Sequence, residues 1–174
     1  MARSGIADRS ISISPTPPTE PRLRMEPTGS RRTLLDGGWW PRSTDPVAEL
    51  PGLILAIDAL RGPVTRLLLA AGDWTSHPRR LGVAGRVVRL GYFTSQPAGL
   101  LTAVRGNRER VDLLVVPPDT AGDLADAAML MAATAGNLIH AQRILLEVGT
   151  PSTRATENAA EAVWDTEGGR LSAA

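Results

Sequence analysis

The sequence predicts an α+β fold, in which an antiparallel sheet of about five to six strands carries two main helices packed on one face. Three features of the 174-residue chain lead to this expectation. One helical stripe of apolar residues lies in the first half of the chain, and a second follows residue 119. Between them, short apolar runs alternate with tight turns. Consecutive strands joined by short turns pair antiparallel, which leaves the helices to cover one face of the sheet.

The first strand and the first helix follow from local patterns. Residues Arg22–Glu26 alternate between charged and apolar side chains, as in a strand with one buried face. Asp45 is placed to cap a helix that begins at Pro46 and ends at Gly62-Pro63. Pro51 lies inside this helix and lacks the backbone N–H that the helix interior uses, so a kink or a restart is expected there.

A series of strands is predicted in the middle of the chain. Gly85 is expected to close one tight hairpin and Gly106–Glu109 a second, because Gly and Asn supply the backbone geometry of turns. Leu113–Val116 is apolar on both faces, which predicts an interior position in the sheet. The runs assigned as strands are 64–71, 79–84, 86–93, 100–105 and 110–116.

The chain divides into three predicted units. Residues 1–21 are rich in Pro and Ser and are expected to form a disordered arm. Residues 22–137 are expected to form a single α+β domain that ends with a helix over about residues 120–135. Residues 138–174 are expected to be a C-terminal helical extension and a flexible tail, because 138–148 is apolar at helical spacing.

Composition excludes several kinds of chemistry. The chain has no cysteine, and all 19 of its basic residues are arginine. A thiol nucleophile, a Cys-ligated metal and a lysine Schiff base are therefore excluded, and no cofactor is predicted. The net charge of +1 predicts no strong field for non-specific polyanion binding. The sequence has neither a signal-type leader nor an apolar run of roughly 18 residues, so we expect a cytoplasmic protein without membrane contact.

The run Asp36–Ser43, here named the Trp loop, is the strongest candidate site. Adjacent side chains of an extended segment point to opposite sides, so one of Trp39 and Trp40 is expected in the core and the other beside a cleft. Arg42 can bind a carboxylate or phosphate through two hydrogen bonds, and Asp36 can accept hydrogen bonds. The competing interpretation is a structural corner, in which Asp36 and Arg42 pair with each other or with the backbone.

The segment Asp73–Pro78 contains residue types of a hydrolase triad. Asp73, Ser76 and His77 are close in sequence, however, whereas triad members normally converge from separate elements. A hydrogen-bonded turn is therefore the preferred interpretation. No metal site is predicted, since the chain has two histidines, no cysteine and no His-Glu-x-x-His pattern.

Arginines are frequent in the hairpin that spans Arg79–Arg89. They can form a stripe that binds phosphates, with Tyr92 and Phe93 nearby to stack on bases. They can equally form a solvated outer face, whose arginine stems cover apolar parts of the sheet. The second interpretation is preferred, because no RNA-binding signature accompanies the arginines.

The Trp loop and several other segments resemble a family of small actinobacterial proteins classed as a domain of unknown function. The resemblance covers about residues 22–135 and implies a shared fold and an intracellular bacterial setting. It implies no activity. The segments that carry it are Asp36–Ser43, Glu49–Pro51, Gly62–Arg66, Asp73-Trp74, Pro78–Leu81, Gly85–Gly91 and Asp112–Asp119.

We therefore expect a non-catalytic binding or regulatory module that holds a small anionic ligand or a protein partner at the Trp loop. The predicted binding residues are Asp36, Trp39, Trp40, Arg42 and Arg66. One alternative is an enzyme with Asp36 or Asp73 as its acid or base. Arg42 or Arg66 would assist it. A weaker alternative is nucleic-acid binding through the Arg79–Arg89 hairpin.

Overall fold

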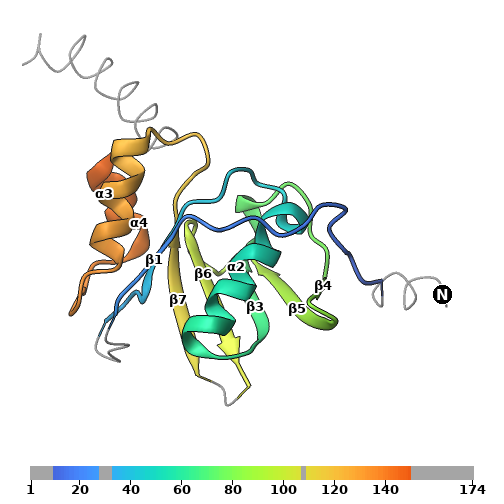
Figure 1. Ribbon diagram of the computed structural model, residues 1–174. Helices are drawn as coiled ribbons and strands as arrows, with labels where there is room; N and C mark the ends of the chain where they lie inside the picture. Colours follow the sequence, from blue (N-terminus) through green and yellow to red (C-terminus); the bar gives the residue numbers. More distant parts are fainter. Residues whose placement is uncertain (1–9, 28–32, 107–108, 150–174) are drawn as a thin grey trace, which may run out of the picture.

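The computed structural model describes residues 10–27, 33–106 and 109–149, which form a sheet between two groups of helices (Figure 1). The strands are β1 (Leu23–Met25), β2 (Gly37–Trp39), β3 (Val64–Ala70), β4 (Arg80–Val83), β5 (Arg86–Phe93), β6 (Leu100–Arg105) and β7 (Arg110–Val115). The helices are α2 (Pro46–Arg61), α3 (Gly122–Ala132) and α4 (Ala141–Val148), with a short 3-10 helix, η1 (Ala71–Asp73). Residues 1–9 of the predicted arm and 150–174 of the predicted tail lie outside the described residues.

The sheet has seven strands in the order β1-β2-β7-β6-β3-β5-β4. Strands β2, β7, β3 and β5 run in one direction, because β2 pairs with β7 and β3 with β5 in parallel. The α+β class is confirmed, and four of the six strand pairs in the described sheet are antiparallel, as expected. The expected number of five to six strands and the purely antiparallel pairing are wrong. In the hairpin of β4 and β5, the second strand, β5, lies next to β3. The first strand, β4, pairs with β5 and forms the edge of the sheet.

Helices cover both faces of the sheet, so the expectation of two helices on one face is also wrong. Leu113 packs in a core under α2, whereas its neighbour Leu114 packs in a second core under α3 and α4. The physical reason lies in β7 itself. This interior strand is apolar on both faces, as expected, and each face needs an apolar cover.

Helix α2 begins and ends as its sequence indicates. The Asp45 carboxylate accepts a hydrogen bond from the Val47 N–H at 3.1 Å, and Pro46 is the first helical residue. The helix runs without a break through Pro51. At its C-terminal end, Asp58 accepts the Val64 N–H at 2.7 Å and pairs with Arg86, which ties α2 to β3 and β5. None of the described helices is both long and apolar enough to span a membrane.

Residues 10–21 follow the edge of the domain. Ser12 donates its N–H to the Arg80 carbonyl at 2.9 Å and accepts the Gly82 N–H at 2.8 Å, which adds one bridge beyond β4. Further along, the Thr19 carbonyl lies against Gly52 of α2. The predicted boundaries at residues 21 and 137 stay predictions.

Strand β2 is buried along its whole length. A Cβ on Gly37 would lie 2.1 Å from the Arg24 carbonyl oxygen of β1, and a Cβ on Gly38 would lie 2.8 Å from the Met129 Cα of α3. Trp39 points to the other face and stacks on Trp74, with ring centroids 5.9 Å apart and planes at 23°. The two glycines thus let β1 and α3 approach a strand that carries a large core side chain.

We predict that Gly37→Ala destabilises the domain by about 2–3 kcal/mol, because the added methyl group meets backbone that cannot rotate away. The measurement is urea-induced unfolding. Gly72→Ala is the matched control, since a Cβ there meets nothing within 4 Å. Equal midpoints for the two variants would contradict the close packing of β1 on β2.

Candidate functional site

Trp40 lies on the opposite side of the Trp loop from Trp39, as the alternation predicts. Its indole Nε1 donates to the Pro117 carbonyl at 3.1 Å, and its ring packs against the second core. The Arg22 guanidinium lies over this ring, 3.6 Å from the centroid, and donates to the Trp40 and Pro41 carbonyls at 2.9 Å each. Arg22 and Trp40 therefore fix the course of the chain after β2.

Arg42 is exposed and bonded to neighbouring backbone. Its guanidinium donates to the Glu20 carbonyl at 3.1 Å, and its backbone N–H donates to the Glu49 carboxylate at 2.8 Å. The other oxygen of Glu49 accepts from the Ser43 hydroxyl at 3.0 Å. The first turn of α2 thus holds the second half of the Trp loop.

Asp36 lies at the other end of β2 from Arg42, so the structure does not bring these two predicted site residues together. One Asp36 carboxylate oxygen accepts the Asp112 N–H of β7 at 2.8 Å. Burial raises the pKa of Asp36, and the charges of Asp112 and Glu26 add to this, while the Asp112 N–H and Arg61 oppose it. These contacts join β2 to β7 and leave Asp36 away from the second half of the loop.

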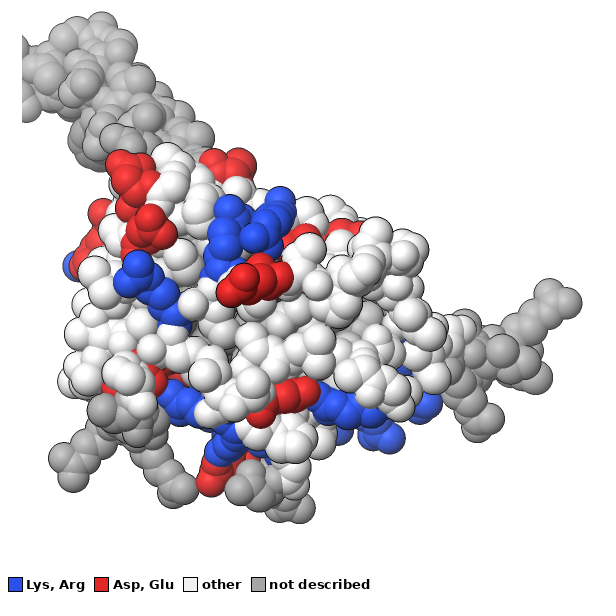
Figure 2. Space-filling model, viewed as in Figure 1, with Lys and Arg blue, Asp and Glu red and all other residues white. Residues whose placement is uncertain are grey.

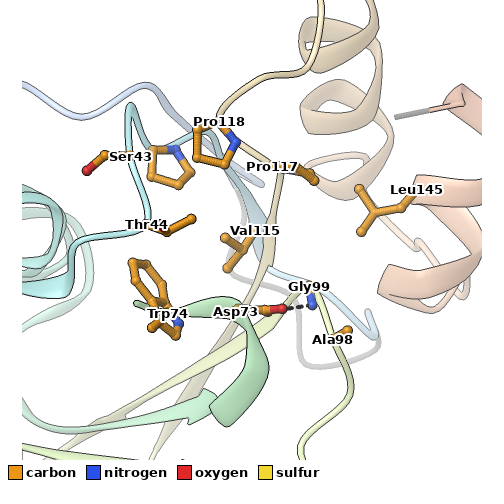
Figure 3. Close-up of a pocket in the computed structure, with 11 residues that line it drawn as sticks. Ser43, Thr44, Asp73, Trp74, Ala98, Gly99, Val115, Pro117, Pro118 and Leu145 are labelled. Carbon is orange, nitrogen blue, oxygen red and sulfur yellow. Dashed lines mark hydrogen bonds between the residues drawn. The ribbon is translucent and has the colours of Figure 1, made fainter. Parts of the chain in front are cut away.

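A cavity of about 340 Å³ lies at the edge of the sheet that the carboxyl ends of β2, β3 and β7 form (Figure 3). Three chain segments that follow these strands form most of its wall, and the turn before β6 and one face of α4 close it. The lining residues are Pro41, Ser43, Thr44, Asp73, Trp74, Ala98, Gly99, Val115, Pro117, Pro118 and Leu145. The wall is mainly apolar, and ligands of open α/β sheets commonly bind at this edge.

Asp73 is the one ionisable side chain among these lining residues. One of its carboxylate oxygens accepts the Gly99 N–H at 2.8 Å (Figure 3). The other oxygen has no hydrogen-bond partner among the residues that the structure describes. Burial raises the pKa of Asp73, and the hydrogen bond from Gly99 opposes the rise. The cavity therefore holds a half-buried carboxylate with acceptor capacity to spare.

Trp74 is the tryptophan that lines the cavity, and sequence reasoning did not single it out. It is buried against Trp39, so the cavity wall is continuous with the core under α2. Thr75 ties the same segment to the Trp loop, because its N–H and its hydroxyl donate to the Thr44 carbonyl at 3.0 and 3.1 Å. The signal in the sequence was the position of Asp73-Trp74 directly after an apolar strand.

The remaining candidates lie elsewhere. His77 contacts Tyr92 edge to face at 4.6 Å and bonds the Ala71 carbonyl at 2.8 Å, so it does not meet Asp73. Arg66 lies on β3, on the sheet face opposite α2. In the part of the chain that the structure describes, no group of three or more His, Cys, Asp or Glu side chains is placed to hold a metal ion.

The fold and the cavity define a small α+β domain with a ligand-sized hollow at the carboxyl edge of a mixed sheet. The chain belongs to the Family of unknown function (DUF5994), whose model matches residues 22–132. The match includes the Trp loop and Asp73 but ends before α4, which supplies Leu145 to the cavity. Curated proteins and solved structures give no match to the chain.

We predict that Asp73→Asn stabilises the domain at neutral pH. The amide oxygen still accepts the Gly99 N–H, while the cost of burying a charge disappears. Because the folded-state pKa of Asp73 is raised, the charged carboxylate lowers the free energy of unfolding of the wild type at pH values above that pKa. The wild type regains this stability as the pH falls through the pKa. The advantage of the variant should therefore shrink with falling pH.

Urea unfolding from pH 8 to pH 4 measures this, with Asp126→Asn on the exposed side of α3 as the control. A stability difference for Asp73→Asn that stays the same at every pH would contradict the burial of this carboxylate.

Proposed function

We propose that this protein is a non-catalytic binding module that holds a small, mainly apolar ligand in the cavity beside the Trp loop. The observation that carries the proposal is Asp73, a half-buried carboxylate with one free oxygen in an apolar wall. The cavity volume of about 340 Å³ falls in the range of small-molecule sites, which is roughly 300–1,000 Å³. Such sites combine apolar walls with a few polar groups that orient the ligand.

The charge of the wall supports a neutral or cationic ligand. The sequence favoured a small anion because of Arg42, but Arg42 is absent from the residues that line this cavity. A carboxylate accepts hydrogen bonds and repels anions. The ligand that fits is therefore an apolar body that carries an ammonium or hydroxyl group, with the donor directed at Asp73.

Binding is favoured over catalysis for two reasons. Acid–base catalysis generally relies on a second ionisable group or an activated nucleophile, and Asp73 is the one ionisable residue among the described residues that line the cavity. The Ser43 hydroxyl of the wall is already bonded to Glu49 at 3.0 Å. The enzyme alternative built on Asp36 and Arg42 is not favoured, because these residues lie at opposite ends of β2.

We predict that the cavity discriminates among three probes with the same ring: benzylamine, benzyl alcohol and benzoate. Benzylamine should bind best, with a dissociation constant on the order of 1 mM, because its ammonium group meets the Asp73 carboxylate. Benzoate should bind least. Tryptophan fluorescence reports binding directly, since Trp74 lines the cavity, and thermal melting gives an independent measure.

Two variants locate the binding. Asp73→Asn should abolish the preference for benzylamine over benzyl alcohol, because the carboxylate is lost. Ala98→Phe should reduce binding of every probe by filling the cavity, whereas Ala127→Phe on the exposed side of α3 should have no effect. A preference for benzoate would refute the proposal. The proposal would also be refuted if none of the three probes gave a response at about 10 mM, which is 10-fold the expected dissociation constant.

A further inference from the structure

Part of the sheet face opposite α2 has no described helix on it. Helices α3 and α4 pack against β1, β2 and β7, at one end of the sheet (Figure 1). The same face continues over β6, β3, β5 and β4, where Val87 and Phe93 are 43% and 46% exposed. Figure 2, viewed from the same side as Figure 1, shows the side of α2, where arginine and acidic side chains lie interspersed over the surface.

Three arginines form a row across this open face. Arg66 of β3 is the direct partner of Arg89 of β5, and Arg89 is the direct partner of Arg80 of β4. Their neighbours Leu67, Val88 and Leu81 point into the core under α2, so the three arginines point away from it. Adjacent strands lie about 4.8 Å apart, so the three positively charged side chains rise from neighbouring positions.

No acidic side chain in the described part of the chain pairs with the arginine row. Within the described residues, the guanidinium groups of Arg66, Arg80 and Arg89 make no hydrogen bond or ion pair. Arg86 of the same hairpin differs, because it points toward α2 and pairs with Asp58. Like charges at directly opposed positions of a sheet destabilise it, and a bound anion removes that cost.

The row lies between two hollows. One, of about 350 Å³, is lined by the row and by Leu68 and Phe93. The other, of about 580 Å³, shares Arg66 and Arg89 with the first and continues past Val87 and Val104. The two hollows share Arg66 and Arg89, so they lie next to each other on this face and are together named the groove here.

Phe93 gives the groove an aromatic surface. Its ring lies over Gly91, where an added Cβ would be 2.8 Å from the ring atom Cε2. The ring is about half exposed and belongs to the same hollow as the arginines. Exposed aromatic rings beside arginines are the surfaces on which unpaired bases stack.

We propose that this open arginine face, formed by Arg66, Arg80, Arg89 and Phe93, binds single-stranded nucleic acid. The arginines contact backbone phosphates, and Phe93 stacks on one base. A duplex fits less well, because its bases are already stacked and cannot reach the ring. The face shares no lining residue with the cavity beside the Trp loop, so the two proposals stand independently.

The test is fluorescence anisotropy of the full chain with a labelled 12-nucleotide single strand of mixed sequence. Three neutralised phosphates give a slope of log K against log salt of about −2, so binding should weaken roughly 20-fold between 50 and 200 mM salt. The double variant Arg66→Gln/Arg89→Gln should lower the slope by about 1.4. Phe93→Leu should weaken binding at least about fivefold.

Arg143→Gln is the matched control, because it removes the same charge from an exposed position on α4. It should leave the affinity unchanged. An equal loss in Arg143→Gln and Arg89→Gln would overturn the assignment to this face. Three results would each overturn the proposal of a single-strand site. These are an equal affinity for a duplex, competition by inorganic phosphate at equal phosphate concentration, and no binding at 50 mM salt.

Discussion

Strand β2 is three residues long, yet both cores of the domain meet on it. Gly37 lets β1 approach, and Gly38 lets α3 approach from one face. Trp39 fills the other face and stacks on Trp74, which in turn forms a wall of the cavity. A larger residue at either glycine would separate layers that position the cavity, so the close packing around β2 is the constraint on which the site depends.

The direction of the strands explains where the cavity lies. Because β2, β3 and β7 run parallel to one another, the segments that leave them converge at one edge of the sheet. Each segment contributes a different kind of surface: prolines after β2 and β7, and Asp73 with Trp74 after β3. The part of the other face that no described helix covers carries the row of Arg66, Arg80 and Arg89, whose guanidinium groups pair with none of the described residues. One small sheet therefore presents an acidic, apolar hollow and a basic, open groove in separate places.

Local patterns in the sequence predicted the elements well, because each depends on neighbouring residues. Asp45 caps α2, Gly85 closes a hairpin, and the doubly apolar run of β7 lies inside the sheet. Pairing was not predictable in the same way. Alternation shows which face of a strand is buried but not which strand lies beside it, and β2, with three residues, is too short to give a periodic signal. The cavity was not predicted for the same reason. The sequence places Asp73 in a turn, and Asp73 becomes part of a cavity wall only because the positions of β2 and β7 bring Pro41 and Pro117 to the same cavity.

The proposed site depends most directly on the state of the Asp73 carboxyl group, which nuclear magnetic resonance can follow through the side-chain carboxyl carbon. In the free protein, burial should place the pKa of Asp73 above the ordinary range for aspartic acid. Benzylamine should lower this pKa, because an ammonium group stabilises the carboxylate, while benzyl alcohol should lower it less. An Asp73 that titrates in the ordinary range and does not respond to benzylamine would contradict the proposed site.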